Sequence, residues 1–217
     1  MKLVNGVEVF SELGEILSPS HTALLVVDMQ NDGCLPEGWM ARQGRDVSRI
    51  TAMIPTLQRL LGAARAAGVK VVFVQQTTLP DNGSDPPAWL YFKTRDGRTR
   101  TDYMLDGMWG HELLEFLEPR PGEVRVKKHR PSAFYQTALD LLLKSAGVGS
   151  VVVCGTITQG CVLATTLDAS FHNYYTVVAE DCTQSYNQEL HETALAFLRS
   201  RYDVVPAEAI VRAGGWS

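Results

Sequence analysis

The sequence predicts an α/β fold, a doubly wound and mostly parallel sheet with helices on both faces. Three observations support this fold class. Apolar runs that suit strands alternate along the chain with amphipathic segments that suit helices. The strand segments hold consecutive valines, as in strands that are buried on both faces. The chain has 217 residues, of which 45% are hydrophobic and 20% charged, which is enough for one domain with a large core.

The first half of the chain begins with a strand, a helix and a second strand. The segment "TALLVVDMQND" (22–32) opens with an unbroken apolar run, which predicts a buried strand. A helix is expected over 47–67, where Pro55 indicates a kink or a later start and Gly68 marks the end. Its apolar stripe consists of Ile50, Met53, Ile54, Leu57, Leu60 and Leu61. The next strand is "KVVFVQQ" (Lys70–Gln76).

The second half continues the alternation of strands and helices. We expect strands in "GEVRVKK" (122–128), "SVVVCG" (150–155) and "YTVVAEDC" (175–182). Helices are expected over 137–147, 159–172 and 187–201, and "YDVVPAEAIV" (202–211) reads as a last strand with a short helix. No repeat or linker divides the chain. We therefore expect one domain over residues 1–217, with an N-terminal extension of about 20 residues.

Charge and composition exclude several classes of protein. The net charge is −4 and the only basic cluster is "RVKKHR", which argues against binding to nucleic acids or to anionic membranes. No apolar run reaches the roughly 20 residues that span a bilayer, and the N-terminus does not resemble a signal peptide. Four cysteines do not make a disulfide framework in a chain of this size. We expect reduced thiols and a cytoplasmic location.

Parallel sheets of this kind place their sites at the carboxyl ends of the strands. The first strand ends at Asp28, where a carboxylate next to a buried run requires a partner, or caps a turn. In "VRVKKHRPSAF", alternation along the strand turns Lys128 to the inner face that Val124 and Val126 share, and Lys127 to the other. A solvated basic turn is the alternative interpretation of these lysines.

Two cysteines occur in "VVVCGTITQGCVLATT" (151–166). Cys154 continues the valine strand, so we expect a packed and unreactive thiol. Cys161 comes after a tight turn at the start of the next helix, where unpaired N–H groups favour a thiolate and can face an oxyanion. A carboxylate, an amine and a thiol at three strand ends together favour nucleophilic catalysis by Asp28, Lys128 and Cys161. The cysteine spacing suits neither zinc nor a redox pair.

The motifs "ALLVVDMQND", "KHRPSAF", "GTITQGCVLATTLDA" and "VVAEDC" resemble those of the isochorismatase-like cysteine hydrolases, over about residues 22–205. This family includes nicotinamidases, N-carbamoylsarcosine amidohydrolases and ureidoacrylate amidohydrolases, on a Rossmann-like three-layer fold. The resemblance implies that Asp28, Lys128 and Cys161 form a catalytic triad that hydrolyses an amide or carbamoyl group through a thioester. It also implies a cis peptide at Thr156–Ile157 and an oxyanion hole made of the Ile157 and Cys161 N–H groups.

The sequence departs from parts of the family. Nicotinamidases carry an Asp-x-His-x-x-His metal site after the second strand, where this chain reads "FVQQTTLPDNGSD". We therefore expect no metal site of that kind, and no cofactor. The true isochorismatases lack the cysteine and cleave a vinyl ether, so Cys161 favours acyl or carbamoyl chemistry. The family also implies a homo-oligomer, either a dimer or a tetramer.

Candidate pocket residues come from two loops. The connection between Gln76 and His111 holds the aromatic residues Trp89, Tyr91, Phe92, Tyr103 and Trp109. Aromatic residues are enriched in ligand pockets and in subunit interfaces, and both alternatives stay open for them. We predict that Gln76, Trp39 and Trp89 contact the substrate, a small linear amide, ureido or carbamoyl compound. The competing hypotheses are a vinyl-ether hydrolase with Asp28 as the acid, and a thiol sensor without catalysis.

Overall fold

The computed structural model describes residues 1–95, 97 and 101–216. Its centre is a six-stranded sheet in the order β5-β4-β3-β6-β7-β8, and all five neighbouring pairs are parallel. The strands are β3 (Thr22–Val27), β4 (Lys70–Gln76), β5 (Val124–Lys128), β6 (Ser150–Thr156), β7 (Tyr175–Gln184) and β8 (Asp203–Val205). This confirms the predicted fold class. Every residue of β3 and β6 is buried, as their unbroken apolar runs predict.

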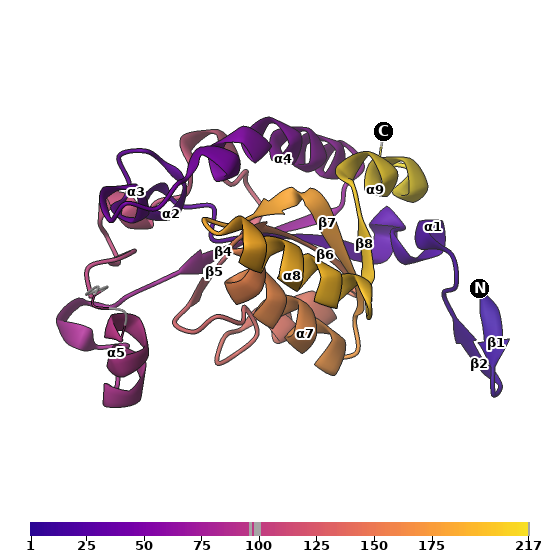
Figure 1. The fold of residues 1–217 in the computed structure, drawn as a ribbon. Helices are drawn as coiled ribbons and strands as arrows, with labels where there is room; N and C mark the ends of the chain where they lie inside the picture. Colours follow the sequence, from indigo (N-terminus) through magenta and orange to yellow (C-terminus); the bar gives the residue numbers. More distant parts are fainter. Residues whose placement is uncertain (96, 98–100, 217) are drawn as a thin grey trace.

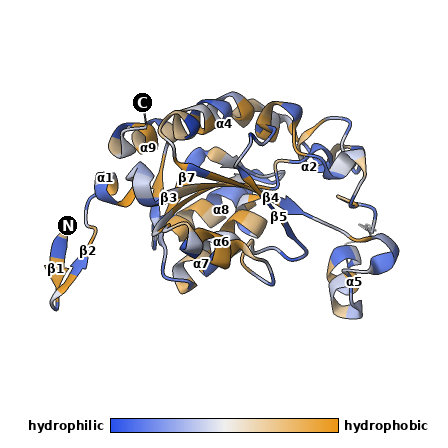
Figure 2. Cartoon of the chain, turned by 180° about the vertical axis from the view of Figure 1, so that it is seen from behind, coloured by the Kyte–Doolittle hydropathy of each residue, from blue (hydrophilic) through white to orange (hydrophobic). Residues whose placement is uncertain are grey.

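Helices cover both faces of this sheet (Figure 1). On one face, α4 (Ser48–Ala66) and α9 (Ala207–Gly214) pack against β7. On the other face lie α6 (Leu139–Ser145), α7 (Leu163–Phe171) and α8 (Gln188–Arg199). The two cores therefore lie on opposite sides of the strands, whose apolar colouring stands out at the centre of Figure 2.

The helix boundaries follow the predicted pattern with one local difference. The first long helix begins at Ser48 and runs through Pro55, so the proline does not delay its start. The segment predicted as a helix from residue 159 instead begins with a π-helical turn, Thr158–Val162, and becomes α-helical only at Leu163. Gly160 has non-helical angles inside this turn, φ −115° and ψ −105°, which interrupt the regular spiral.

The N-terminal residues form a small separate sheet. Strands β1 (Lys2–Val4) and β2 (Val7–Val9) pair in antiparallel fashion and lie away from the main sheet in Figure 1. From Phe10 onward the chain contacts the main body: Phe10 packs on Tyr175, and α1 (Leu13–Ile16) contacts α9. The 3₁₀ turn Pro19–His21 then leads directly into β3.

Short elements fill the loops at the carboxyl end of the sheet. After β3 come α2 (Asn31–Cys34) and α3 (Trp39–Arg42), and after β4 come the 3₁₀ turn Pro80–Asn82 and α5 (Pro87–Thr94). The 3₁₀ turns Trp109–His111 and Glu115–Leu117 precede β5. The helix α5 lies apart from the sheet in Figure 1 and was not expected from the sequence. Among the described residues, no helix is long and apolar enough to cross a membrane.

Gly155 determines how closely β6 approaches β3 at this end. Its φ is +114°, and a Cβ built on it would lie 2.0 Å from the Val27 carbonyl oxygen. Only glycine fits both the backbone angle and the space. The close approach brings the turn after β6 beside Asp28, the residue that follows β3.

We predict that Gly155→Ala lowers the free energy of unfolding by at least about 2 kcal/mol, because the added methyl group meets backbone and not a movable side chain. The matched control is Gly62→Ala inside α4, where a Cβ would meet nothing within 4 Å. That change should stabilise the protein by up to about 1 kcal/mol through helix propensity. Urea unfolding measures both, and equal effects of the two substitutions would contradict the role of Gly155.

Candidate active site

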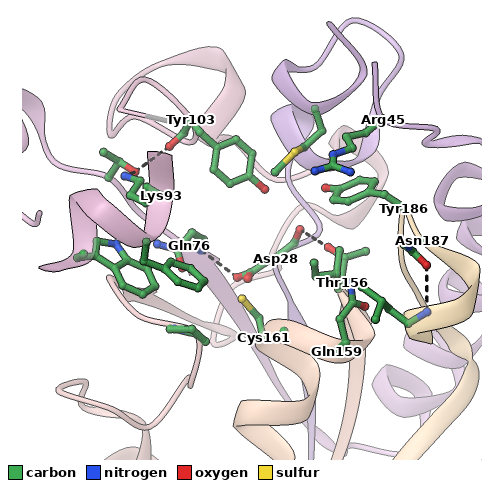
Figure 3. Close-up of a pocket in the computed structure, with 18 residues that line it drawn as sticks. Asp28, Arg45, Gln76, Lys93, Tyr103, Thr156, Gln159, Cys161, Tyr186 and Asn187 are labelled. Carbon is green, nitrogen blue, oxygen red and sulfur yellow. Dashed lines mark hydrogen bonds between the residues drawn. The ribbon is translucent and has the colours of Figure 1, made fainter. Parts of the chain in front are cut away.

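A pocket of about 330 Å³ opens at the carboxyl end of the sheet, beside the ends of β3, β4 and β6 (Figure 3). It combines polar groups with apolar and aromatic walls. The polar lining consists of Asp28, Arg45, Gln76, Thr78, Lys93, Thr156, Gln159, Cys161 and Asn187. The remaining lining residues are Met40, Trp89, Phe92, Tyr103, Pro131, Ile157, Gly160, Tyr186 and Leu190.

Asp28 is held from both its backbone and its side chain. Its backbone is left-handed, with φ 51°, a conformation that aspartate tolerates better than most residues. Its N–H donates to the Val74 carbonyl at 2.9 Å, and its own carbonyl accepts from Thr156 Oγ1 at 3.0 Å. The carboxylate accepts from the Gln76 N–H at 2.9 Å and pairs with Lys128 Nζ at 2.8 Å. The carboxylate is therefore buried but paired, as its position after an apolar strand requires.

Lys128 is fully buried and contacts the other two predicted reactive groups, Asp28 and Cys161. Its ammonium lies 2.8 Å from Asp28 Oδ2, 2.9 Å from Gln76 Oε1 and 3.2 Å from Cys161 Sγ. Burial alone lowers the pKa of Lys128, but the neighbouring Asp28 carboxylate and Cys161 sulfur outweigh burial and raise it above its ordinary value. Lys127 points the other way and pairs with Asp106 near the surface, at 2.7 Å. Strand alternation separates the two lysines as predicted.

Cys161 lies in the π-helical turn and is the one partly exposed cysteine among the four, all of which the structure describes. The pKa of its thiol is raised to about 12, chiefly by burial and then by the Asp28 carboxylate, while Lys128 opposes the shift. The sequence led us to expect a thiolate favoured by the helix start. The raised pKa contradicts that expectation, because burial and the facing Asp28 carboxylate outweigh the effect of Lys128. The resting group is a thiol next to a carboxylate.

The turn that carries Cys161 is supported by α8. The Ile157 carbonyl accepts from the N–H groups of Gly160 at 2.9 Å and Val162 at 3.3 Å. Thr158 Oγ1 lies 2.7 Å from His191 Nδ1, and both side chains are buried. Burial lowers the pKa of His191, which favours its neutral form against the threonine. The Thr156–Ile157 peptide bond is cis. These contacts fix the backbone that follows β6.

The other cysteines pack away from the pocket. Cys154 is fully buried within β6, where burial raises its pKa, and its Sγ lies 3.4 Å from the Leu25 carbonyl oxygen. Cys34 and Cys182 are also fully buried, and burial raises the pKa of Cys34 to about 12. Cys161 is therefore the only one of the four that lines the pocket.

Two of the three predicted substrate contacts line the pocket and one does not. Gln76 and Trp89 are lining residues, and the side-chain amide oxygen of Gln76 accepts a hydrogen bond from Lys128. Trp39 lies behind the wall, so its assignment as a lining residue is corrected. Its N–H is held by Asp32 at 3.0 Å, its indole N–H donates to Asp102, and its ring packs 5.5 Å from the Tyr103 ring. Tyr103, and not Trp39, lines the pocket.

The aromatic residues of the long connection divide into pocket-lining and exposed residues. Trp89, Phe92 and Tyr103 line the pocket. Tyr91 is 70% exposed on the outer face of α5, and Trp109 is 47% exposed beside a different surface depression. The sequence does not separate the pocket-lining aromatic residues of α5 from the exposed Tyr91, because α5 has no strong apolar period that marks its inner face.

Sequence reasoning missed several lining residues. Arg45 comes from the loop between α3 and α4, and Tyr186 and Asn187 come from the loop between β7 and α8. The Tyr186 hydroxyl donates to the Gly33 carbonyl at 2.8 Å, which joins that loop to α2. Tyr186 lies two residues beyond the end of β7, so the strand-end rule that found Asp28 also applies to it. Arg45 had no comparable signal.

The described residues include no group of three or more histidine, cysteine, aspartate or glutamate side chains that could hold a metal ion. The carboxylate Asp85 in the segment after β4 pairs with Lys93 at 2.6 Å. The donor types at the pocket floor, one carboxylate, one ammonium and one thiol, suit proton transfer and nucleophilic attack.

Comparisons with known proteins agree with this architecture. A family model described as the isochorismatase domain matches residues 22–209. The ureidoacrylate amidohydrolase RutB of Methylobacterium radiotolerans is 36% identical over 190 residues, which cover 83% of this chain and 74% of that protein. An isochorismatase family protein from Desulfovibrio vulgaris has a TM-score of 0.75 and 29% identity, covering 88% of this chain and 96% of its own.

An N-carbamoylsarcosine amidase from Thermoplasma acidophilum has a TM-score of 0.67 and 25% identity, over 87% of this chain and 97% of its own. The family model spans the whole sheet from β3 to β8 and includes Asp28, Lys128 and Cys161. The chain belongs to the isochorismatase family of hydrolases.

Proposed function

We propose that the protein is a cysteine-dependent amidohydrolase that cleaves a C–N bond in a small amide, ureido or carbamoyl compound. The observation that carries the proposal is the position of Lys128, which contacts both the Asp28 carboxylate and the Cys161 sulfur at the pocket floor. The similarity to a ureidoacrylate amidohydrolase and an N-carbamoylsarcosine amidase supports this class of substrate.

In the first step, Cys161 Sγ attacks the carbonyl carbon while its proton passes to the Asp28 carboxylate. The thiol needs this base because burial and Asp28 keep it protonated at rest. Lys128 remains an ammonium throughout, which stabilises the negative charge on sulfur as it develops. The C–N bond then breaks, Asp28 returns the proton to the nitrogen, and ammonia or an amine leaves.

The tetrahedral intermediate places negative charge on the former carbonyl oxygen. We assign its binding to the backbone N–H groups of Ile157 and Cys161, since both residues line the pocket and belong to the rigid turn after β6. Donors that are already fixed in position stabilise an oxyanion without reorganisation. The contacts of Thr158 with His191 support the same turn.

In the second step, water hydrolyses the thioester. Asp28, again a carboxylate, takes a proton from the water as its oxygen attacks the acyl carbon. The C–S bond breaks, the sulfur takes the proton back from Asp28, and the acid product leaves. The proton thus moves between Asp28, Cys161 and the reacting groups, while Lys128 stays in contact with both side chains.

Assembly into a dimer or tetramer and a cytoplasmic location remain predictions from the sequence and the family. Light scattering coupled to size-exclusion chromatography measures the number of subunits directly. A monomer at assay concentrations would contradict the predicted assembly and would leave the proposed chemistry as it stands, because the three reactive groups come from one chain.

We predict that Cys161→Ala lowers kcat for the best substrate in a panel of amides, ureides and carbamoyl compounds by about 1,000-fold or more, since it removes the nucleophile. Ammonia release measures turnover. The control is Cys154→Ala, which removes a cysteine that is buried in β6 and does not line the pocket. Full ammonia release by the Cys161→Ala enzyme would contradict the proposal. Pyruvate release from a vinyl ether by that variant would instead favour the vinyl-ether hydrolase.

We predict that a small excess of iodoacetamide alkylates Cys161 before the other cysteines and that activity is lost in parallel. Cys34 is the matched comparison, because burial raises both pKa values to about 12 but only Cys161 reaches the pocket. Below that pKa the thiolate fraction grows about tenfold per pH unit, so alkylation should accelerate from pH 7 to pH 9 without a plateau. Mass spectrometry of peptides measures the order of alkylation and its rate at each pH. Equal labelling of Cys34 and Cys161 would contradict the assignment.

A further inference from the structure

The helix α5 supplies one wall of the pocket from outside the sheet. Its residues Trp89, Phe92 and Lys93 all line the pocket. They stand three and four positions apart, which places them on one face of the helix. Figure 3 shows Lys93 on α5, apart from Asp28 and Cys161. A helix of eight residues with an exposed outer face has little core of its own to hold it in place.

A buried ion pair links this helix to the chain that precedes it. Lys93 Nζ lies 2.6 Å from Asp85 Oδ2, and the two side chains are only 8% and 2% exposed. Lys93 also donates to Thr78 Oγ1 at 3.3 Å, and Asp85 accepts from Ser84 Oγ at 3.1 Å. Thr78 lies two residues beyond the end of β4, so the pair connects α5 to the carboxyl end of the sheet. A buried charge needs a partner, so the pair favours a position of α5 in which Lys93 faces Asp85.

The same contacts determine where the aromatic side chains stand. The Trp89 and Phe92 rings stack with centroids 4.8 Å apart and an interplanar angle of 17°. The Arg130 guanidinium lies over the Trp89 ring at 4.7 Å and donates to the Ser84 carbonyl, next to Asp85. Thr78 Oγ1 in turn donates to the carbonyl of Tyr103, another lining residue. Displacing the ion pair therefore moves the aromatic wall and its neighbour together.

We propose that the Lys93–Asp85 ion pair is a positioning device that holds the Trp89–Phe92 wall, and thereby determines how tightly longer substrates bind. The inference rests on the proposed amidohydrolase function. Lys93 and Asp85 make no hydrogen bond or ion pair to Asp28, Lys128 or Cys161 in the described part of the chain. Their contribution is to substrate binding and not to bond breaking.

The test compares variants that keep or remove the pair. Lys93→Met leaves Asp85 buried without its cation and can unfold the protein, so the main variant is the double substitution Asp85→Asn with Lys93→Met, which removes both charges at similar volume. Lys93→Arg keeps the charge and should keep KM close to that of the wild type. Lys144→Met is the control, because Lys144 forms an ion pair of similar length with Asp140 on α6, away from the pocket.

We expect the double variant to raise KM about tenfold for the longest amide that the wild type hydrolyses, with kcat within about twofold. KM for acetamide, which is too short to fill the pocket beyond Cys161, should not change. A purely structural role predicts that kcat and KM change alike for both substrates. A kcat loss without a KM change, or an equal effect on acetamide, overturns the proposal.

Hydrogen exchange gives a second measurement that needs no substrate. In the double variant, the amides of α5 should exchange at least about tenfold faster, while those of α6 keep their rates. Unchanged exchange in α5 overturns the positioning role. If the wild-type enzyme hydrolyses no amide, the proposed function is wrong. Hydrogen exchange alone then tests whether the ion pair holds the Trp89–Phe92 wall.

Discussion

The ion pair between Asp28 and Lys128 is the interaction on which the site depends. Two opposite charges lie almost fully buried at the carboxyl end of the sheet, where neither would be stable alone. Breaking a buried pair of this kind costs a protein about 3–5 kcal/mol. Gln76 satisfies both charges further: its backbone N–H donates to the Asp28 carboxylate, and its side-chain oxygen accepts from the Lys128 ammonium. Because Lys128 also contacts Cys161, the ion pair that makes the buried charges stable also brings the reactive groups together.

The sheet order explains why these groups meet. Strand β3 lies between β4 and β6, so Asp28 is flanked by Gln76 on one side and by the turn of Cys161 on the other. Lys128 ends β5, two strands from β3, and in register with Gln76, from where its long side chain reaches across β4. The absence of a side chain at Gly155 lets β6 close against the Val27 carbonyl. Rigid strands thus hold the chemical groups, as precise geometry requires.

The substrate-facing parts have a different origin. Tyr186 and Arg45 come from loops, and the Trp89–Phe92 wall comes from a short helix that one buried ion pair attaches to the sheet. The pocket therefore combines a floor built at the ends of the strands with walls that come from loops and a short helix. Such a division allows one reaction mechanism to accept different substrates through changes in loops alone.

The amino-acid sequence alone determined the fold class, the strands and the side of β5 on which Lys128 lies, because burial and alternation leave a direct pattern in the residues. It also pointed to Asp28 and Cys161, because strands end where apolar runs end. The tertiary structure decided what depends on distant neighbours. Trp39 packs behind Tyr103, a residue 64 positions later, and α5 is held by Asp85 and Thr78 more than by its own period. The Cys161 pKa likewise follows from burial and the facing Asp28 carboxylate, which outweigh the effect of Lys128. Local patterns report which residues are buried, but only the assembled fold determines what each buried group faces.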